Sequence, residues 1–396
     1  MAERSEGSLT AVVIDGPAAA EALVEEWNEG RAVLPLDPRA PRPEHRKLLA
    51  ELRPTHLHGE WGVRALPGGL PVAPEVAAVV ATSGTAGDPK GVELTWAGLE
   101  ASAGAVAEVL GNSRWLCCLP LYGVGGLGVV ARAWSTGDPV EVVARFDTAA
   151  VAETRAKLVS LVPTTLRRCL DDGVDLERFS RVLVGGAGLD SALRARAELA
   201  GAVVVSSYGL TETWGGVVHD GHTLAGVEVR LGADGEIALR APMVMLGYRL
   251  RPDDTAAVLS GDGWLRTGDV GVLDDGGALR IVDRLRDIIV SGGVNVSPTE
   301  VEGVLADHPG VADVGVAGTA DPEWGERVVA HVVAADPAEP PSLAELRDFA
   351  AERLSAAKLP RAVVLVDEVP RTPGGKPVRR LLGSASRAEG RSGPAE

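Results

Sequence analysis

The chain has 396 residues, a length that predicts two or three structural units rather than one small core. Its formal net charge of −16 disfavours nucleic acid and anionic membranes as partners, because like charges repel. No segment reaches the ~20 apolar residues that a membrane helix needs, and the acidic N-terminus does not resemble a secretory signal. The three cysteines lack zinc-type spacing and indicate buried, reduced thiols, so we expect a cytoplasmic protein.

Alternating apolar and helix-length segments dominate the chain after Val76. Strands that are apolar on both faces predict parallel sheets covered by helices. Before this point, the sequence predicts helices over residues 18–27 and 45–52 and one strand over residues 33–36. The strands expected after it are residues 77–81, 115–119, 158–162, 182–184 and 203–205, with helices that include 96–110 and 191–199.

The pattern changes again after Gly226. Short strands separated by Gly and Asp turns predict a small antiparallel sheet or barrel over residues 227–231, 236–240, 270–273 and 279–282. A small α+β unit follows, with helices over 298–305 and 343–354 and strands over 312–317, 328–333 and 362–366. Residues 383–396 have low complexity, and we expect them to be disordered. The predicted fold class is therefore α/β, with a large N-terminal part of parallel-sheet layers.

Residues 82–91 have the sequence TSGTAGDPKG, between an expected strand and an expected helix. Glycines let backbone N–H groups converge on an anion, hydroxyl groups donate to phosphate oxygens, and a lysine adds charge. The loop is not a Walker A motif, because Pro89 precedes Lys90. An ordinary Gly-rich turn is the alternative. The candidate phosphate ligands are Thr82, Ser83, Gly84, Thr85, Gly87 and Lys90.

This loop resembles the TSGTTGxPKG signature of the adenylate-forming superfamily, which includes acyl-CoA synthetases, peptide-synthetase adenylation domains and luciferases. Ala86 replaces the second threonine of that signature, so one hydroxyl contact to the pyrophosphate end would be lost. The resemblance covers nearly the whole chain, because further motifs follow in the order of the family. They are YGLTE (208–212), WLRTGD (264–269), DRLRDIIVSGGVNVSPTEVE (283–302) and PRTPGGKPVRR (370–380).

The resemblance implies transfer of AMP from ATP to a carboxylate, with Mg²⁺ as the metal. Thr211 would contact the α-phosphate, Glu212 would help to hold Mg²⁺, and Lys376 would be the catalytic lysine that bridges the carboxylate and the α-phosphate. A hard cation that bridges phosphates prefers carboxylate oxygen, which agrees with the role of Glu212. The implied adenine contacts are Gly186, Ala187 and Tyr208, Gly209 is a further implied ATP/AMP-binding residue, and the implied ribose contacts are Asp269 and Arg284.

The resemblance also implies an N-terminal domain over residues 1–284 and a mobile C-terminal domain over residues 285–396. Arg286 would lie at the hinge, and Gly292 and Gly293 would line the channel for the thiol of coenzyme A. Asp283 replaces a glycine of the family. A carrier protein or a nitrogen nucleophile is an alternative acceptor. A non-catalytic nucleotide-binding relative is a further alternative, supported by the departures at Ala86, Asp283 and Gly123.

The short N-terminal region resembles the o-succinylbenzoate–CoA ligases of menaquinone synthesis, particularly actinobacterial ones, and it could expose a homodimer face. Gly123 stands where many of those ligases have histidine, which argues against that acid. Several glycines predict room for a bulky or aromatic carboxylic acid. His219 would meet a second polar group of the acid or face solvent on a strand. The expected pocket residues are Gly123, Gly125, Gly126, Thr164, Trp214, Gly215, Gly216 and His219.

Overall fold

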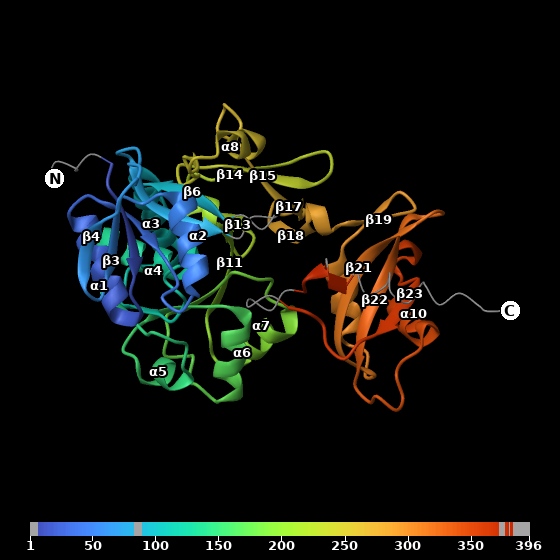
Figure 1. The fold of residues 1–396 in the computed structure, drawn as a ribbon. Coiled ribbons are helices and arrows are strands. Elements are labelled where there is room, and N and C mark those ends of the chain that lie inside the picture. Colours follow the sequence, from blue (N-terminus) through green and yellow to red (C-terminus); the bar gives the residue numbers. More distant parts are fainter. Residues whose placement is uncertain (1–6, 83–88, 372–376, 380, 383–396) are drawn as a thin grey trace. The chain divides into compact units, whose positions relative to one another are not determined.

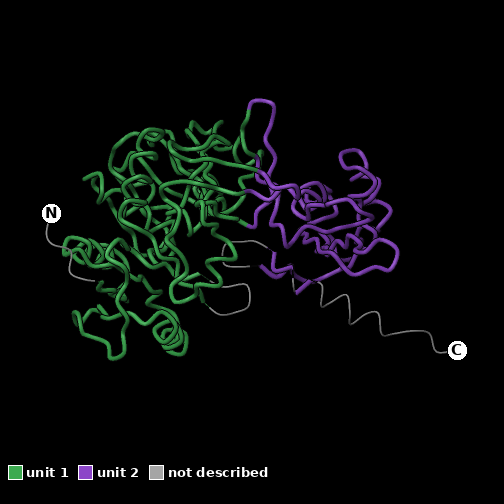
Figure 2. Tube along the Cα trace, turned by 90° about the horizontal axis from the view of Figure 1, so that it is seen from above, with its two compact units in different colours: residues 1–230, 238–267, 277–279 green, residues 231–237, 268–276, 280–396 purple. Residues whose placement is uncertain are grey.

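The computed structural model describes residues 7–82, 89–371, 377–379 and 381–382. The chain divides into two compact units (Figure 2). Unit 1 comprises residues 1–230, 238–267 and 277–279, and unit 2 comprises residues 231–237, 268–276 and 280–396. The domain boundary expected between residues 284 and 285 stays a prediction.

The first sheet of unit 1 has seven strands: β1 (Leu9–Val13), β2 (Ala32–Pro35), β3 (His56–Gly59), β4 (Gly62–Ala65), β5 (Val76–Thr82), β6 (Lys90–Thr95) and β16 (Gly247–Tyr248). Their order is β16-β6-β5-β2-β1-β3-β4. The central strands β5, β2, β1 and β3 are parallel, as predicted. At both edges the sheet departs from this parallel pattern, because β4, β6 and β16, which were not predicted, pair antiparallel with their neighbours.

The second sheet of unit 1 also has seven strands: β7 (Trp115–Cys117), β8 (Val140–Val142), β9 (Leu158–Leu161), β10 (Arg181–Val184), β11 (Val204–Leu210), β12 (Gly215–His219) and β13 (His222–Thr223). Their order is β13-β12-β11-β10-β9-β7-β8. The pairs from β11 to β8 are parallel, and β12 and β13 add an antiparallel margin. The carboxyl ends of the parallel strands therefore share one edge, where α/β sheets usually bind ligands.

Helices cover both faces of each sheet in unit 1. Successive strand residues point to opposite faces, so each apolar strand packs against two helix layers. Helices α1 (Gly16–Asn28), α3 (Trp96–Leu110) and α4 (Val124–Thr136) contact one another through Trp27, Trp96 and Trp134. Helix α2 (Arg42–Leu52) packs on the first sheet, and α5 (Thr148–Glu153), α6 (Pro163–Asp171) and α7 (Ser191–Leu199) pack on the second.

A third sheet has the order β14-β15-β17-β18. Its strands are β14 (Glu228–Leu231), β15 (Glu236–Arg240), β17 (Leu265–Leu273) and β18 (Leu279–Arg284). All four strands were predicted, but β17 begins earlier than expected. Asp269 consequently lies within a strand and not in a turn.

Unit 2 contains a five-stranded sheet of order β20-β19-β22-β21, with β23 also paired to β22. Figure 1 shows β21, β22 and β23 of this sheet beside one another. The strands are β19 (Ile289–Ser291), β20 (Val294–Val296), β21 (Val311–Asp321), β22 (Gly325–Ala334) and β23 (Ala362–Leu365). Helices α9 (Pro298–Leu305) and α10 (Leu343–Ala351) share its core, and the 3₁₀ turns η2 (Leu285–Asp287) and η3 (Ala356–Lys358) complete the unit. Residues 383–396, expected to be disordered, lie outside the described residues. No helix in the described ranges has the length and hydropathy of a bilayer span.

Candidate functional site

The predicted phosphate loop begins at the end of β5 and returns on β6. Thr82 pairs with Lys90 across these antiparallel strands, and the Thr82 hydroxyl donates to the Lys90 carbonyl oxygen at 3.4 Å. The strand pairing therefore holds the two ends of the loop together. Ser83, Gly84, Thr85, Ala86 and Gly87 lie outside the described residues.

Lys90 is connected to Glu212 through Tyr248 and also pairs with Asp254, and sequence reasoning missed both Tyr248 and Asp254. Lys90 Nζ lies 3.1 Å from Asp254 Oδ1 on α8 (Pro252–Val258) and 4.7 Å from the centre of the Tyr248 ring. The Tyr248 hydroxyl donates to Glu212 Oε1 at 2.8 Å. The hydrogen bond from Lys90 and its positive charge lower the pKa of the Asp254 carboxyl. The only feature of the sequence that could have drawn attention to Tyr248 is the scarcity of tyrosine, of which the chain has three.

Glu212 lies in the 3₁₀ turn η1 (Thr211–Thr213). Across the described part of the chain, no three His, Cys, Asp or Glu side chains form a metal-binding group. A single carboxylate is nevertheless compatible with Mg²⁺, because this ion usually takes one or two protein carboxylates together with substrate phosphates. Glu212 therefore fits an ion that arrives with a nucleotide.

Three predicted ligand-binding segments lie at the carboxyl ends of β9, β10 and β11 in the second sheet, and the third includes the last residues of β11 itself. The predicted residues on them are Thr164, Gly186, Ala187, Tyr208, Gly209 and Thr211. The parallel register places Val184 beside Ser206, so the loop after β10 begins next to the last residues of β11, which continue in the sheet to Leu210. A Cβ atom on Gly209 would lie 1.8 Å from the Gly215 carbonyl oxygen, which requires glycine at this position.

The predicted acid-pocket residues lie at the start of α4 and around β12. Gly123 is the N-cap of α4, and Gly125 and Gly126 lie in its first turn. Trp214 is only 1% exposed, has a positive φ of 56°, and donates its indole N–H to the Thr95 carbonyl oxygen at 3.1 Å. The Trp214 ring is thus enclosed within unit 1 with its polar atom satisfied.

His219 is buried at the end of β12, with 4% of its surface exposed. The alternative of a solvent-exposed strand histidine is therefore wrong. Neither ring nitrogen has a partner within the described residues. Burial and then the charge of Arg132 lower the pKa of His219 to about 4, so the ring is neutral at pH 7. A Cβ atom on Gly216 would lie 3.0 Å from His219 Nε2, so glycine gives the imidazole room.

Arg132 on α4 is a buried cation that sequence reasoning missed. Its residue exposure is 7%, and its Nη1 donates to the Trp214 carbonyl oxygen at 3.4 Å. Its Nε has no partner, and no carboxylate of the described residues pairs with it. Burial lowers the pKa of Arg132 to about 10, which still leaves the guanidinium charged at pH 7. The sequence could have indicated a buried Arg132, because this arginine stands inside the apolar run GLGVVARAW.

The two residues predicted to bind ribose lie together in unit 2. Arg284 Nε is 2.8 Å from Asp269 Oδ1, and Asp269 is 5% exposed. The preceding residue, Gly268, donates its N–H to Glu236 Oε1 at 3.1 Å. A second carboxylate, missed by sequence reasoning, thus fixes the backbone beside Asp269.

The predicted hinge and thiol-channel residues also lie in unit 2. Arg286 belongs to η2, and its side chain is 62% exposed. Gly292 and Gly293 turn the hairpin between β19 and β20 with φ of 59° and 78°, values that suit glycine in a two-residue turn. A Cβ atom on Gly292 would lie 2.9 Å from the Trp324 ring. Lys376 lies outside the described residues.

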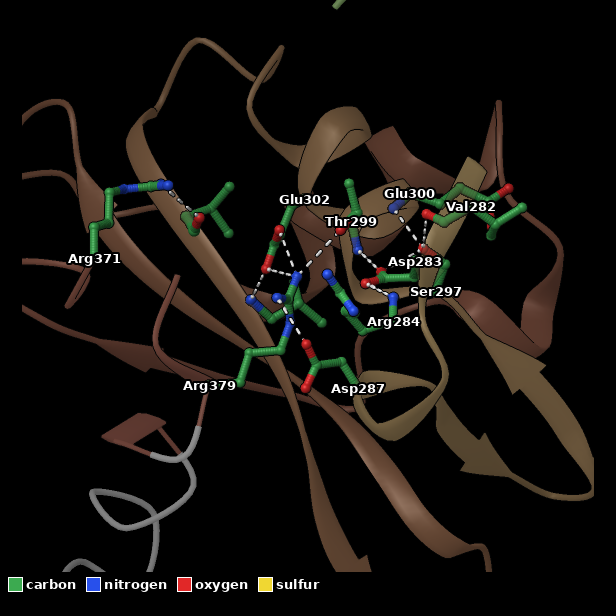
Figure 3. A network of polar contacts seen from close by, with 12 residues as sticks. Val282, Asp283, Arg284, Asp287, Ser297, Thr299, Glu300, Glu302, Arg371 and Arg379 are labelled. Carbon is green, nitrogen blue, oxygen red and sulfur yellow. Dashed lines mark hydrogen bonds and ion pairs between the residues drawn. The ribbon is translucent and has the colours of Figure 1, made fainter. Parts of the chain in front are cut away.

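Asp283 has a structural role where the family has glycine. Its Oδ2 accepts from the Ser297 hydroxyl at 2.8 Å and from the Thr299 N–H at 3.0 Å, at the start of α9 (Figure 3). Its Oδ1 accepts from the Arg284 N–H at 2.8 Å. The carboxylate therefore supplements the N-cap residue Ser297, whose hydroxyl accepts the Glu300 N–H at 3.2 Å, by accepting the Thr299 N–H in the same first turn.

Comparisons with known proteins agree with this organisation. The sequence profile described as AMP-binding enzyme matches residues 8–249, and the AMP-binding enzyme C-terminal domain matches residues 300–376. A probable 2-succinylbenzoate–CoA ligase of Mycobacterium tuberculosis is 39% identical over 343 residues, which is 81% of this chain and 88% of that protein. The 2-succinylbenzoate–CoA ligase of Bacillus subtilis is 34% identical over 342 residues, which is 79% of this chain and 70% of that protein.

Two solved structures resemble the whole chain. The o-succinylbenzoate CoA synthetase of Bacillus subtilis, in complex with its acyl-adenylate intermediate, has a TM-score of 0.83 at 29% identity and covers 95% of this chain and 88% of its own. An amide bond synthetase of Marinactinospora thermotolerans has the same TM-score and identity, with coverage of 96% and 90%. The chain therefore belongs to the AMP-binding enzyme family, the adenylate-forming superfamily that its motifs resemble.

Proposed function

We propose that this protein is an AMP-forming ligase that adenylates 2-succinylbenzoate, or a closely similar aromatic acid, and transfers the acyl group to coenzyme A. Membership of the AMP-binding enzyme family supports the adenylation step. The names of the mycobacterial and Bacillus relatives support both the acid and the thiol.

The observation that carries the choice of acid is the uncompensated charge of Arg132. A buried guanidinium is costly unless an anion pairs with it. The Cys117 thiol interacts with Arg132, but burial raises its pKa to about 11, so it supplies no negative charge at pH 7. 2-Succinylbenzoate has two carboxylates, so one can be activated while the other pairs with Arg132.

The surroundings of Arg132 support this assignment. Cβ atoms on Gly128 and Gly215 would lie 2.8 Å and 3.8 Å from Arg132 Nη1, so glycine at both positions leaves space beside the buried guanidinium. The neutral ring of His219 adds an unpaired donor and an acceptor nearby. Gly123 removes the histidine of many related ligases, and we propose that Arg132 supplies the recognition of the acid instead.

In the proposed first step, positive charge and hydroxyl donors stabilise the charge that develops on the α-phosphate. We assign these roles to Lys90, Thr211 and Lys376. Glu212, fixed by the Tyr248 hydroxyl, would hold Mg²⁺. The ion would neutralise phosphate charge as a Lewis acid. Asp269, held by Arg284, would accept the ribose hydroxyls.

In the proposed second step, the C-terminal domain turns about Arg286 and the thiol of coenzyme A takes the place of Lys376. Gly292 and Gly293 would leave room for the pantetheine arm, because neither has a side chain.

Acid-dependent exchange of labelled pyrophosphate into ATP tests the proposal. We expect exchange with 2-succinylbenzoate and with one of two probes that have a single carboxylate, 3-benzoylpropionate or 2-butyrylbenzoate. Arg132→Met should raise the KM for 2-succinylbenzoate at least about thirty-fold, the cost of truncating one partner of a buried charge pair. It should change the KM for the single-carboxylate probe little. An equal effect on both acids would refute pairing between Arg132 and the second carboxylate.

The amide bond synthetase among the structural neighbours keeps a second candidate open, in which a nitrogen nucleophile accepts the acyl group. Adding coenzyme A or an amine to the enzyme-bound adenylate distinguishes the two, and we expect thioester release with coenzyme A. Absence of exchange across a broad panel of acids would instead favour the non-catalytic alternative.

A further inference from the structure

The connection between β11 and β12 has an accessible half and a buried half. Thr211 and Glu212, the residues assigned to the α-phosphate and to Mg²⁺, are half-buried. Thr213 and Trp214, which follow them, are 0% and 1% exposed. The second half of the connection therefore anchors it within unit 1, while the first half keeps its side chains within reach of a ligand.

The Thr213 hydroxyl joins the two strands at the base of this connection. Leu210 ends β11 and pairs with Gly215, which begins β12. Thr213 Oγ1 accepts the Leu210 N–H at 3.0 Å, and it lies 2.7 Å from the Gly215 carbonyl oxygen and 3.1 Å from the Leu210 carbonyl oxygen. A hydroxyl has one hydrogen to donate, and the shorter contact is the one to Gly215. One side chain thus fastens both strand ends from inside the connection.

The remaining hydrogen bonds of the connection act on its two other anchored residues, Glu212 and Trp214. The Met245 N–H donates to the Glu212 carbonyl oxygen at 2.7 Å, and the Tyr248 hydroxyl donates to the Glu212 carboxylate at 2.8 Å. The indole N–H and the carbonyl oxygen of Trp214 bond to the N-cap residue of α3 and to Arg132 on α4. These bonds hold the backbone on either side of the Thr213 hydroxyl, which alone spans from the connection to both strands.

We propose that Thr213 is a positioning residue for adenylate formation. Its hydroxyl, bonded to the ends of β11 and β12, fixes the backbone from which the Thr211 and Glu212 side chains project. Groups that stabilise a transition state are effective only when their positions are set in advance. The inference rests on the roles proposed for Thr211 and Glu212 and deepens the first step of the proposed function.

Thr213→Val and Thr213→Ser test the proposal on the full-length enzyme. Valine keeps the branched shape and removes the hydroxyl, whereas serine keeps the hydroxyl and loses a methyl group. Thr213→Val should lower the kcat of pyrophosphate exchange by about ten- to a hundred-fold, since misplacement of a catalytic group by about 1 Å can cost a hundred-fold. Thr213→Ser should retain most of the kcat, because its hydroxyl can make the same hydrogen bonds.

The Mg²⁺ requirement is the readout that a merely structural role would not change. At a fixed ATP concentration, Thr213→Val should need about three- to ten-fold more Mg²⁺ for half-maximal exchange, the usual value of one hydrogen bond. Thr165→Val is the matched control. Thr165 Oγ1 accepts the Val162 N–H at 3.0 Å and donates to the Val162 carbonyl oxygen at 2.9 Å, a similar local pattern at the start of α6. The Mg²⁺ requirement of Thr165→Val should equal that of the unsubstituted protein.

Thr213→Cys keeps the test decisive if Thr213→Val does not fold. A thiol is a weaker donor and acceptor than a hydroxyl, so the kcat of Thr213→Cys should fall between those of the serine and valine variants. An unchanged Mg²⁺ requirement in the folded valine or cysteine variant would overturn the positioning role. A serine variant as slow as the valine variant would also overturn it, because the hydroxyl would then not be the group that matters.

Glu212→Gln separates this proposal from the proposed function. If Glu212→Gln leaves both the kcat and the Mg²⁺ requirement unchanged, the role assigned to Glu212 is wrong and the positioning role falls with it. If Glu212→Gln raises the Mg²⁺ requirement while Thr213→Val behaves as the unsubstituted protein, only the positioning role is overturned.

Discussion

Lys90 and Asp254 form an ion pair, with 3.1 Å between Nζ and Oδ1, at the point where the predicted phosphate loop returns to the sheet. The two side chains are 23% and 36% exposed, so the pair is accessible to a competing anion. The polyphosphate of ATP has several negative charges and would displace a single carboxylate. Asp254 therefore opposes nucleotide binding at the lysine that we expect to receive it.

Asp254→Asn should lower the KM for ATP by about three-fold, because it removes a solvent-exposed ion pair that competes with the nucleotide for Lys90 and contributes little by itself. The kcat of pyrophosphate exchange should not change. Asp253→Asn, in the same first turn of α8, is the control for simple loss of one negative charge. An increase in KM with Asp254→Asn would show that the carboxylate helps to orient Lys90 for the nucleotide.

Tyr248→Phe should lower kcat/KM for ATP by about three- to ten-fold, the usual value of one hydrogen bond. The variant removes the 2.8 Å bond that orients the Glu212 carboxylate and leaves the aromatic ring in place. Titration with Mg²⁺ should show a higher requirement for the metal. Tyr122→Phe is a suitable control elsewhere in unit 1. Unchanged Mg²⁺ dependence in Tyr248→Phe would argue against Glu212 as the metal-holding residue.

The sequence was sufficient to predict the central strands, because residues that are buried on both faces form uninterrupted apolar runs such as Val76–Thr82. It was insufficient for the sheet margins. The strand Gly247–Tyr248 has two residues and exists only through its pairing with β6. His222–Thr223 is exposed, so no apolar pattern identifies it. Short edge strands depend on their partners more than on their own composition.

The same distinction explains which site residues were predicted. Thr211, Glu212 and Asp269 belong to motifs in which chemistry fixes residue type and spacing within a few positions. Arg132 and Tyr248 interact with residues 82 and 36 positions away. Contacts over such distances depend on the folded arrangement of α4, β12 and β16, and a local pattern does not contain this information.

The buried His219 predicts a pH-dependent stability. Its pKa is about 4 in the folded protein and 6.5 ordinarily, so the unfolded chain binds a proton between these values that the folded protein does not. The contribution of His219 to the free energy of unfolding is thus fully present above pH 6.5. It is lost as the pH falls toward 4, and the total loss is about 3 kcal/mol at most. Arg132 opposes protonation, while Asp220 favours it to a smaller extent.

Urea unfolding followed by tryptophan fluorescence at pH 7 and pH 5 measures this effect. The midpoint of the parent protein should fall more between these pH values than the midpoint of His219→Gln, which does not titrate. Carboxylates titrate in both proteins and cancel in the comparison. Equal shifts of the two midpoints would contradict a neutral, buried His219.

Asp283→Gly, which restores the residue of the family, should destabilise unit 2 by about 1 kcal/mol through loss of a helix cap. The Thr299 N–H and the Ser297 hydroxyl would lose their acceptor, and glycine would add backbone freedom at the end of β18. Asp283→Asn keeps one acceptor oxygen and should lose less. Hydrogen exchange of the α9 amides is the direct measurement, because it reports this helix without requiring the whole chain to unfold. If the α9 amides of Asp283→Gly exchange hydrogen faster while pyrophosphate exchange is unchanged, the carboxylate is a structural replacement for the family glycine. If pyrophosphate exchange is lost while the α9 amides stay protected, Asp283 instead acts on the nucleotide through Arg284.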